Sequence, residues 1–238
     1  MPTLLKFDRP GVGSTTQVGL LRHRHIWRAA SAYDRAFRND PLHVYLTVSA
    51  GVTNTPLSIF RKRFLAVVGL LVWMRTQLVL TVDDGATVVT AEVPSKESSG
   101  LRIRFLNWFY NTLSHWVRKL TYTNEALKRR AECDTKMKPV IADKLGDRAK
   151  DMIYIPLIVT EPESQGRGYS KALLSTVTNI ADSRGLASWL FSSNIRNEGF
   201  YNKCGFVAAG SFALGDGNPT WDKDPIVVQL MIREPKTA

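Results

Sequence analysis

Hydrophobic positions repeat at helical spacing through much of the first 150 residues. In residues 27–37 apolar side chains stand three or four apart, and Asn39-Asp40-Pro41 is expected to end that helix. Pro56 stands where the first turn of a helix tolerates proline. Two β-branched runs flank Asp83-Asp84-Gly85, which predicts a hairpin. The expected elements are helices at 27–37, 57–74, 101–120 and 124–133, and hairpin strands at 78–82 and 87–93.

The pattern changes after residue 150, where short apolar strands alternate with helices. The helix that begins after the Gln165–Ser170 turn is amphipathic, and Gly185 marks its expected end. Strand–helix–strand order implies parallel pairing in an α/β sheet. With 238 residues, a single domain over residues 1–238 is expected, with a helical insertion at about 94–150. Strands are expected at 152–159, 189–191, 206–212 and 226–232, and helices at 172–181 and 194–204.

Charge is distributed unevenly along the chain. The formal net charge is +11, yet residues 151–238 contain eight Lys/Arg and nine Asp/Glu, so the excess of positive charge lies in residues 1–150. A basic surface attracts anions. A solvated face, nucleotide phosphates, acidic lipid and nucleic acid are all compatible with this excess. No zinc-finger spacing or heptad-linked basic region is present in the sequence, so specific nucleic-acid recognition is not expected.

Cysteine usage and hydropathy favour a cytoplasmic protein without a transmembrane segment. Cys133 and Cys204 cannot form a disulfide framework, and no histidines stand near them at metal-ligand spacing, so no metal site is expected. The start of the chain lacks the apolar stretch of a secretory signal. The most apolar run, residues 64–74, is about half as long as a bilayer crossing requires. A monomer or homodimer is expected.

The turn at residues 165–170 lies between a strand and a helix. A helix start offers N–H groups without helical acceptors, and Gly166 and Gly168 leave room for a phosphate to reach them. A glycine pair before a helix is often only a tight turn. A Walker loop is excluded because Gly-Lys-Ser/Thr is missing. The dinucleotide fingerprint also fails, since Ser170 replaces its third glycine.

Residues 159–174, Val-Thr-Glu-Pro-Glu-Ser-Gln-Gly-Arg-Gly-Tyr-Ser-Lys-Ala-Leu-Leu, resemble the acetyl-CoA motif of the GNAT N-acetyltransferase superfamily. That motif reads Gln/Arg-x-x-Gly-x-Gly/Ala. Asn194, followed by Tyr201-Asn202-Lys203-Cys204-Gly205-Phe206, resembles the second signature of the family. The close match covers residues 153–206. The insertion at about 94–150 is similar to that of long-insert members found in fungi.

The resemblance implies a mixed α/β fold, with a mostly antiparallel sheet, a central splayed parallel strand pair and flanking helices. It also implies that acetyl-CoA is the co-substrate. Tyr201 would protonate the departing thiolate, while Asn194 and main-chain groups would hold the coenzyme. The proton of the amine must go to a base, for which Glu92 and Glu161 are candidates. The implied cofactor-binding residues are Leu157, Ile158, Val159, Gln165, Gly166, Arg167, Gly168, Tyr169, Ser170 and Asn194.

The chain departs from the family pattern at three places. Ser170 replaces Gly/Ala, which a helix start should accept because serine is small. The turn between Val159 and Gln165 is one residue longer than the commonest form, which leaves open which main-chain donor contacts the thioester. Asn197 replaces a small apolar residue.

The function expected from this resemblance is transfer of an acetyl group from acetyl-CoA to a primary amine of a small molecule, by direct attack in a ternary complex. The alternatives are a non-catalytic acyl-CoA-binding sensor or scaffold, a protein or peptide N-acetyltransferase, and an anion- or nucleic-acid-binding protein. Trp108, Phe109 and Trp116 are candidates either for the packed core or for an aromatic lid or wall of the substrate pocket. All four histidines, His23, His25, His43 and His115, lie outside the motif, and His115 could line the same pocket.

Overall fold

The computed structural model describes residues 17–52, 55–94 and 100–236, so the start of the chain and most of the loop before residue 100 lie outside the described residues. The described strands form one seven-stranded sheet of order β1-β2-β3-β4-β5-β7-β6, in which only β4 and β5 are parallel. The expected mixed, mostly antiparallel sheet with a central parallel pair is confirmed. The strands are β1 (Gly19–Leu20), β2 (Leu78–Val82), β3 (Thr87–Glu92), β4 (Ile153–Thr160), β5 (Ser188–Ser192), β6 (Val207–Leu214) and β7 (Ile226–Arg233).

The helices agree with the hydrophobic pattern, with two differences. α5 continues well past residue 133, through Pro139, because its second half packs on β6. Asp40 ends α1 as expected and also caps a new helical turn by accepting the N–H of His43 at 3.0 Å. The longer helices are α1 (Ile26–Phe37), α3 (Pro56–Thr76), α4 (Leu101–Thr121), α5 (Asn124–Lys144) and α6 (Tyr169–Ser183). The shorter helical segments include α2 (Pro41–His43), η2 (Val44–Val48), η3 (Asp83–Gly85), η6 (Pro162–Ser164), η7 (Ile195–Asn197) and α7 (Glu198–Lys203).

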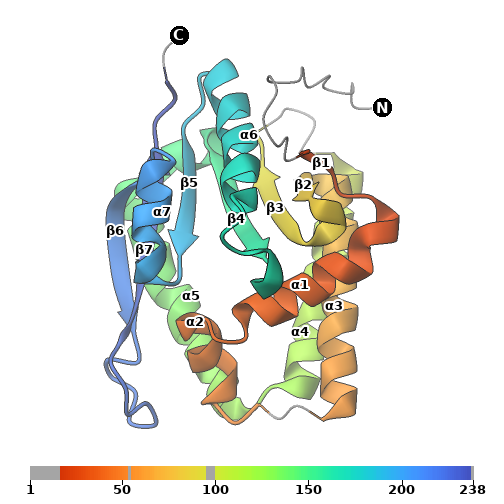
Figure 1. Ribbon diagram of the computed structural model, residues 1–238. Helices are drawn as coiled ribbons and strands as arrows, with labels where there is room; N and C mark the ends of the chain where they lie inside the picture. The colour runs from red at the N-terminus through yellow and green to blue at the C-terminus, as the bar shows by residue number, and fades with distance from the viewer. Residues whose placement is uncertain (1–16, 53–54, 95–99, 237–238) are drawn as a thin grey trace.

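Helices cover both faces of the sheet (Figure 1). α6 and α7 lie in front of the central strands, and Leu173, Leu174 and Val177 of α6 enter the largest apolar cluster. On the opposite face α1 and α3 cover the half that contains β2 and β3, while α5 packs on β6. α4 packs on α3, so the two helices inserted between β3 and β4 complete the second helical layer. None of the described helices meets the length and hydropathy required for a membrane span.

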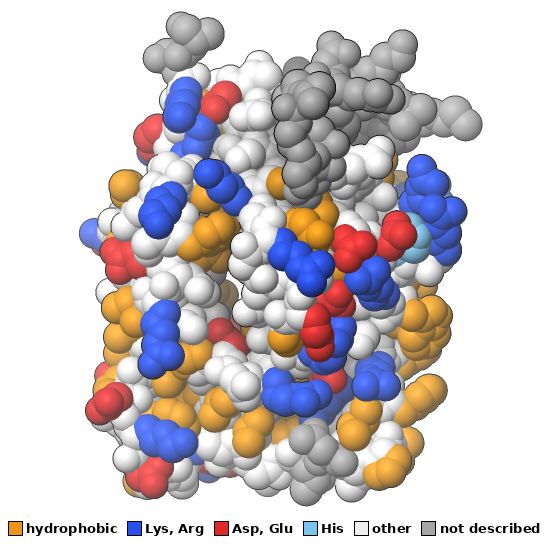
Figure 2. All heavy atoms as spheres, viewed as in Figure 1, with side chains coloured by type: hydrophobic (Ala, Val, Ile, Leu, Met, Phe, Trp, Pro, Cys, Tyr) orange, Lys and Arg blue, Asp and Glu red, His pale blue; other side chains and the backbone are white. Residues whose placement is uncertain are grey.

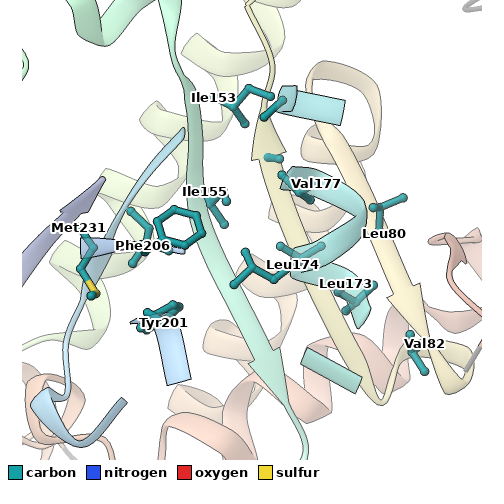
Figure 3. Packing of buried hydrophobic residues seen from close by; sticks show 14 residues of the cluster. Leu80, Val82, Ile153, Ile155, Leu173, Leu174, Val177, Tyr201, Phe206 and Met231 are labelled. Atoms are coloured by element: carbon teal, nitrogen blue, oxygen red, sulfur yellow. The ribbon is translucent and has the colours of Figure 1, made fainter. Parts of the chain in front are cut away.

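A β-bulge in β4 allows this strand to contribute side chains to two apolar clusters, one on each face of the sheet. The register with β3 shifts between Thr90 and Glu92, so that two residues of β4 oppose one residue of β3. Ile153 before the bulge and Ile155 within it face the largest apolar cluster, the one under α6 (Figure 3). After it, Leu157 and Val159 belong to the cluster formed with α1 and α3. The bulge therefore turns the odd-numbered side chains in the second half of β4 toward the opposite face of the sheet.

Candidate functional site

β4 and β5 diverge after a short paired segment. They pair at Ile153↔Ser188 and Tyr154↔Trp189, and the rings of Tyr154 and Trp189 stack with centroids 4.0 Å apart. Such an aromatic pair stabilises the end at which the two strands stay together. The bulge follows immediately in β4, and Pro156 within it has no N–H that would need an acceptor. The two strands therefore form the expected splayed pair.

The side of β4 that faces this opening can be assigned from one hydrogen bond. The N–H of Glu161 donates to the carbonyl of Ala86 at 2.9 Å, on the β3 side. Alternate residues of a strand direct their main-chain groups to the same side. Ile158 and Thr160 therefore direct theirs toward β5, beyond the last β4–β5 pair. Of the three residues predicted to offer main-chain groups, Leu157, Ile158 and Val159, this arrangement favours Ile158.

The glycine loop follows the open end of β4. Gly166 and Gly168 both have φ of +77°, which strongly disfavours residues with a side chain, and an added Cβ at either would meet nothing within 4 Å. Gly168 is the N-cap of α6, so the first N–H groups of that helix lack helical acceptors. The hydroxyls of Thr160 and Ser170 are hydrogen-bonded at 2.6 Å and join the strand to the helix start. The loop thus presents an open, donor-rich turn that suits a phosphate.

Tyr201 and Asn194 come from the segment after β5. Tyr201 in α7 is 6% exposed and lies beside Phe206 and Met231 in the α6 cluster (Figure 3). Burial, with a smaller contribution from Cys204, raises the pKa of Tyr201 to about 12. The phenol therefore keeps its proton at physiological pH. Asn194 caps η7, because its side-chain oxygen accepts the N–H of Arg196 at 3.1 Å, and its amide group carries two N–H donors in addition.

Comparisons with known proteins agree with this geometry. Residues 131–206 match the model of the Acetyltransferase (GNAT) family. The chain is 28% identical over 216 residues to a protein of the fission yeast Schizosaccharomyces pombe described as an uncharacterized N-acetyltransferase, covering 88% of this chain and 80% of that protein. The resemblance to GNAT acetyltransferases is confirmed.

Solved structures show the same fold at low sequence identity. Arylalkylamine N-acetyltransferase 2 from Aedes aegypti is 11% identical, with a TM-score of 0.60, covering 92% of this chain and 99% of that chain. A structure from Corynebacterium glutamicum, described as histone acetyltransferase HPA2 and related acetyltransferase, is 16% identical, with a TM-score of 0.55, covering 93% and 97%. The GNAT fold therefore extends over nearly the whole chain.

The two carboxylates predicted as general bases lie in different environments. Glu161 is buried, with Arg28 Nη2 2.9 Å from Oε1 and Arg35 Nη2 2.5 Å from Oε2. Burial alone would raise its pKa, but hydrogen bonds from Arg28 and Ser164 and both arginine charges lower the pKa overall. In Figure 2 acidic and basic side chains lie together over the region of α1. A carboxylate held this way is a poor proton acceptor.

Glu92 lies near the end of β4 that is still paired with β5. It is in register with Tyr154, and Gln77 Nε2 donates to its Oε1 at 2.8 Å. Its side chain reaches solvent, although partial desolvation by its neighbours raises its pKa. Glu92 is therefore a better proton acceptor than Glu161, but it lies at the other end of β4 from the glycine loop.

A cavity of about 270 Å³ adjoins β4 on the face opposite α6. Leu157 and Val159 form its floor, and α1, α3 and α4 form its walls. Asp40, His43 and Ser193 lie in its lining, where Ser193 Oγ donates to Asp40 Oδ2 at 2.8 Å. The Asp40 charge also contributes to the raised pKa of Tyr201, so this part of the cavity lies close to the predicted acid.

The sequence motifs did not indicate the residues that line this cavity. His43 is one of the histidines outside the motif, yet it lies in the lining. Burial lowers its pKa against the raising effect of Asp40, and the Lys62 charge adds to the lowering. Arg118 of α4 and Arg130 of α5 also line the cavity. Both come from the insertion, where the sequence does not distinguish them from other basic residues. No sequence spacing relates His43, Arg118 and Arg130, because they come from three separate helices, α2, α4 and α5.

The predicted aromatic wall is wrong in its members. Trp108 and Trp116 are 61% and 54% exposed, and Phe109 is exposed as well. They point away from the core because the opposite side of α4, which carries the buried Ser114, faces inward. Tyr110 and Tyr122 line the cavity instead, together with Tyr33 of α1 and Trp73 of α3, and His115 is not among the lining residues that the structure describes.

Proposed function

We propose that this protein transfers the acetyl group of acetyl-CoA to the primary amine of a small molecule. The observation that carries the proposal is the opening between β4 and β5, with the Ile158 main chain directed into it and the Gly166–Gly168 loop at its end. The loop would hold the pyrophosphate through its N–H groups and the start of α6. The main-chain groups of Ile158 and the amide of Asn194 would hold the arm of the coenzyme.

The chemical step is a direct transfer. The amine nitrogen attacks the thioester carbonyl carbon, the new C–N bond forms, the C–S bond breaks, and the amine proton passes to a base. The N–H of Ile158 is the candidate donor to the oxyanion, and one such donor contributes about 3 kcal/mol to lowering a barrier. Tyr201 donates its proton toward the departing thiolate. The pKa of about 12 keeps this phenol protonated until that moment.

We assign the role of base to His43 rather than to Glu161 or Glu92. Its lowered pKa keeps the imidazole neutral near pH 7, so that it can accept a proton. His43 also lines the cavity that adjoins β4, whereas Glu161 is held by two arginines. Glu92 remains the second candidate because its pKa is raised.

The cavity favours a small amine that carries an acidic group. Its volume of about 270 Å³ suits a small molecule rather than a folded protein partner. Asp40 and His43 lie in the part near Tyr201, where the amine would bind. Arg118 and Arg130 of the insertion supply positive charge beside Tyr122, since both lower the pKa of this phenol against the raising effect of burial. A carboxylate or phosphate on the acceptor would bind these arginines.

A matched pair of acceptors tests both parts of the proposal. Phenylalanine and phenethylamine differ only by the carboxylate, and release of free thiol from acetyl-CoA reports turnover. We expect both to be acetylated, with the higher kcat/KM for phenylalanine. Arg130→Gln should reduce that preference about tenfold, because an acceptor carboxylate loses its charged partner. Arg104→Gln, on the exposed side of α4, is the matched control and should leave the preference unchanged.

The outcomes separate the alternatives. Higher kcat/KM for phenethylamine would leave acetyl transfer standing and refute the acidic acceptor. Turnover of a lysine-containing peptide above both small amines would favour the protein or peptide acetyltransferase. Calorimetric binding of acetyl-CoA without turnover of any acceptor would favour the sensor or scaffold.

A further inference from the structure

The outer sides of α3 and α4 expose large apolar side chains. On α4 most of them are three, four or seven residues apart, which places them on one side of the helix. Leu101 is 82% exposed, and Trp108 and Trp116 are more than half exposed. We call this surface the outer face. Its apolar members are Leu57, Phe60, Phe64 and Leu71 of α3 and Leu101, Phe105, Trp108, Phe109, Trp116 and Leu120 of α4.

The two helices lie side by side and antiparallel. Trp73 and Tyr110 make an edge-on ring contact at 5.9 Å near the C-terminal end of α3. Arg61 Nη1 donates to the carbonyl of Leu120 at 3.2 Å near its N-terminal end. The exposed apolar residues of α3 and α4 therefore lie on two adjacent helices. Isolated exposed apolar residues are ordinary, but ten on two packed helices indicate an interaction surface.

The charges on these helices have one sign. α3 contains Arg61, Lys62, Arg63 and Arg75, α4 contains Arg102, Arg104, Arg118 and Lys119, and neither helix contains Asp or Glu. Lys119 Nζ lies 5.4 Å from the ring centroid of Trp116, so cationic and aromatic groups are interleaved on the outer face itself. Long basic side chains can lie along apolar surface while their charged ends reach a polar layer.

We propose that the outer face docks on an anionic lipid surface. Aromatic side chains together with Arg and Lys on one side of a helix suit the boundary between acyl chains and acidic headgroups. A second copy of this chain in a symmetric dimer would oppose the same cations to each other without any carboxylate from α3 or α4 to neutralise them. Charge complementarity therefore selects acidic lipid as the partner.

Vesicle sedimentation with the full chain tests the proposal. We compare vesicles of phosphatidylcholine alone with vesicles containing phosphatidylserine, at low and high salt. The chain should pellet with the acidic vesicles, less at high salt. Trp108→Ser combined with Trp116→Ser should weaken binding about tenfold. Trp27→Ser is the matched control, because Trp27 on α1 is 67% exposed and lies outside the outer face.

A charge variant and a mass measurement complete the test. Arg102→Gln with Arg104→Gln should also reduce pelleting, whereas thermal unfolding should change little because both side chains are exposed. The proposal is overturned if no acidic vesicle binds the chain, if neutral vesicles bind it equally well, or if the Trp27 control matches the Trp108/Trp116 variant. A dimer in sedimentation velocity that the Trp108/Trp116 variant dissociates would identify a second copy as the partner instead.

Discussion

Tyr201 and His43 approach β4 from opposite faces of the sheet. Tyr201 lies in the apolar cluster under α6, and His43 lines the cavity bounded by α1, α3 and α4. Their pKa values move in opposite directions, to about 12 for the phenol and below the ordinary value for the imidazole, mainly because both are buried. At neutral pH one group therefore holds a proton to give and the other has a site to receive one.

A pH profile of kcat/KM separates the two roles. Loss of activity in acid should begin below about pH 6.5, where His43 gains a proton. His43→Gln should lower kcat/KM about 100-fold at pH 7.5 and remove this acid limb. The titration of the acceptor itself cancels in the ratio of variant to wild type. Tyr201→Phe should lower the profile at every pH without shifting it and keep the affinity for acetyl-CoA.

Two results would contradict this assignment. An acid limb that survives in His43→Gln would transfer the role of base to Glu92. A Tyr201→Phe variant with kcat within about twofold of wild type would show that the phenol is only part of the core, since general acid catalysis contributes far more.

At the scale of elements, α6 has a left-handed glycine at each end. Gly168 with φ of +77° precedes the helix and Gly185 with φ of +63° follows it, and an added Cβ at either meets nothing within 4 Å. Alanine at either position should therefore cost a similar strain of about 1 kcal/mol in the free energy of unfolding. The two positions differ in that only Gly168 adjoins the proposed phosphate donors.

Calorimetry of the two variants isolates the function of the loop from its strain. Gly168→Ala should weaken acetyl-CoA binding about tenfold, because the methyl group and the displaced N–H groups face the phosphate. Gly185→Ala should bind as wild type does while losing the same stability. Equal affinity of the two variants would refute the placement of the pyrophosphate on this loop.

At the scale of the whole molecule, Glu161 joins the end of β4 to α1. Its folded-state pKa is lowered, so the ionised carboxylate stabilises the fold above the unfolded value of about 4.3, and this stability is lost as pH falls through the folded pKa. Glu161→Gln should cost about 2 kcal/mol at pH 7, less than a fully buried pair because Arg28 and Arg35 are a third or more exposed.

Denaturant unfolding between pH 7 and pH 3 measures this contribution. The difference between wild type and Glu161→Gln should shrink as the carboxylate of the wild type is protonated. Glu163→Gln is the control, since Glu163 pairs with Arg35 at the surface and should contribute no more than about 0.5 kcal/mol. A constant difference across the pH range would show that Glu161 acts through packing and not through charge.

The sequence correctly predicted the features that depend on the preferences of neighbouring residues. The Asp-Gly hairpin, the strand at 152–159 and the glycine turn before α6 follow from residue preferences over a few positions, and all are present. Strand order was less accessible, because helix α7 between β5 and β6 suggested a parallel pair, whereas β7 lies between those strands. Long-range pairing depends on the whole sheet and not on the connecting helix.

The sequence likewise predicted only the part of the candidate site that lies within one segment of the chain. The loop and Tyr201 lie within one stretch of sequence, so a motif could reveal them. The cavity assembles His43, Arg118 and Arg130 from helices that are distant along the chain, and no spacing relates them. The orientation of α4 was also beyond the sequence, since the aromatic stripe could have faced either the core or solvent.

After its bulge, β4 has an unpaired main-chain edge inside the sheet. Past Tyr154 the strand keeps β3 on one side and has an open edge on the other, in the middle of the molecule and not at its rim. An amide-bearing ligand laid along that edge would act as a surrogate strand. If acetyl-CoA binds in this way, its amide groups would pair with the free edge of β4. Binding would then fill the gap between β4 and β5, and product release would open it again in each turnover.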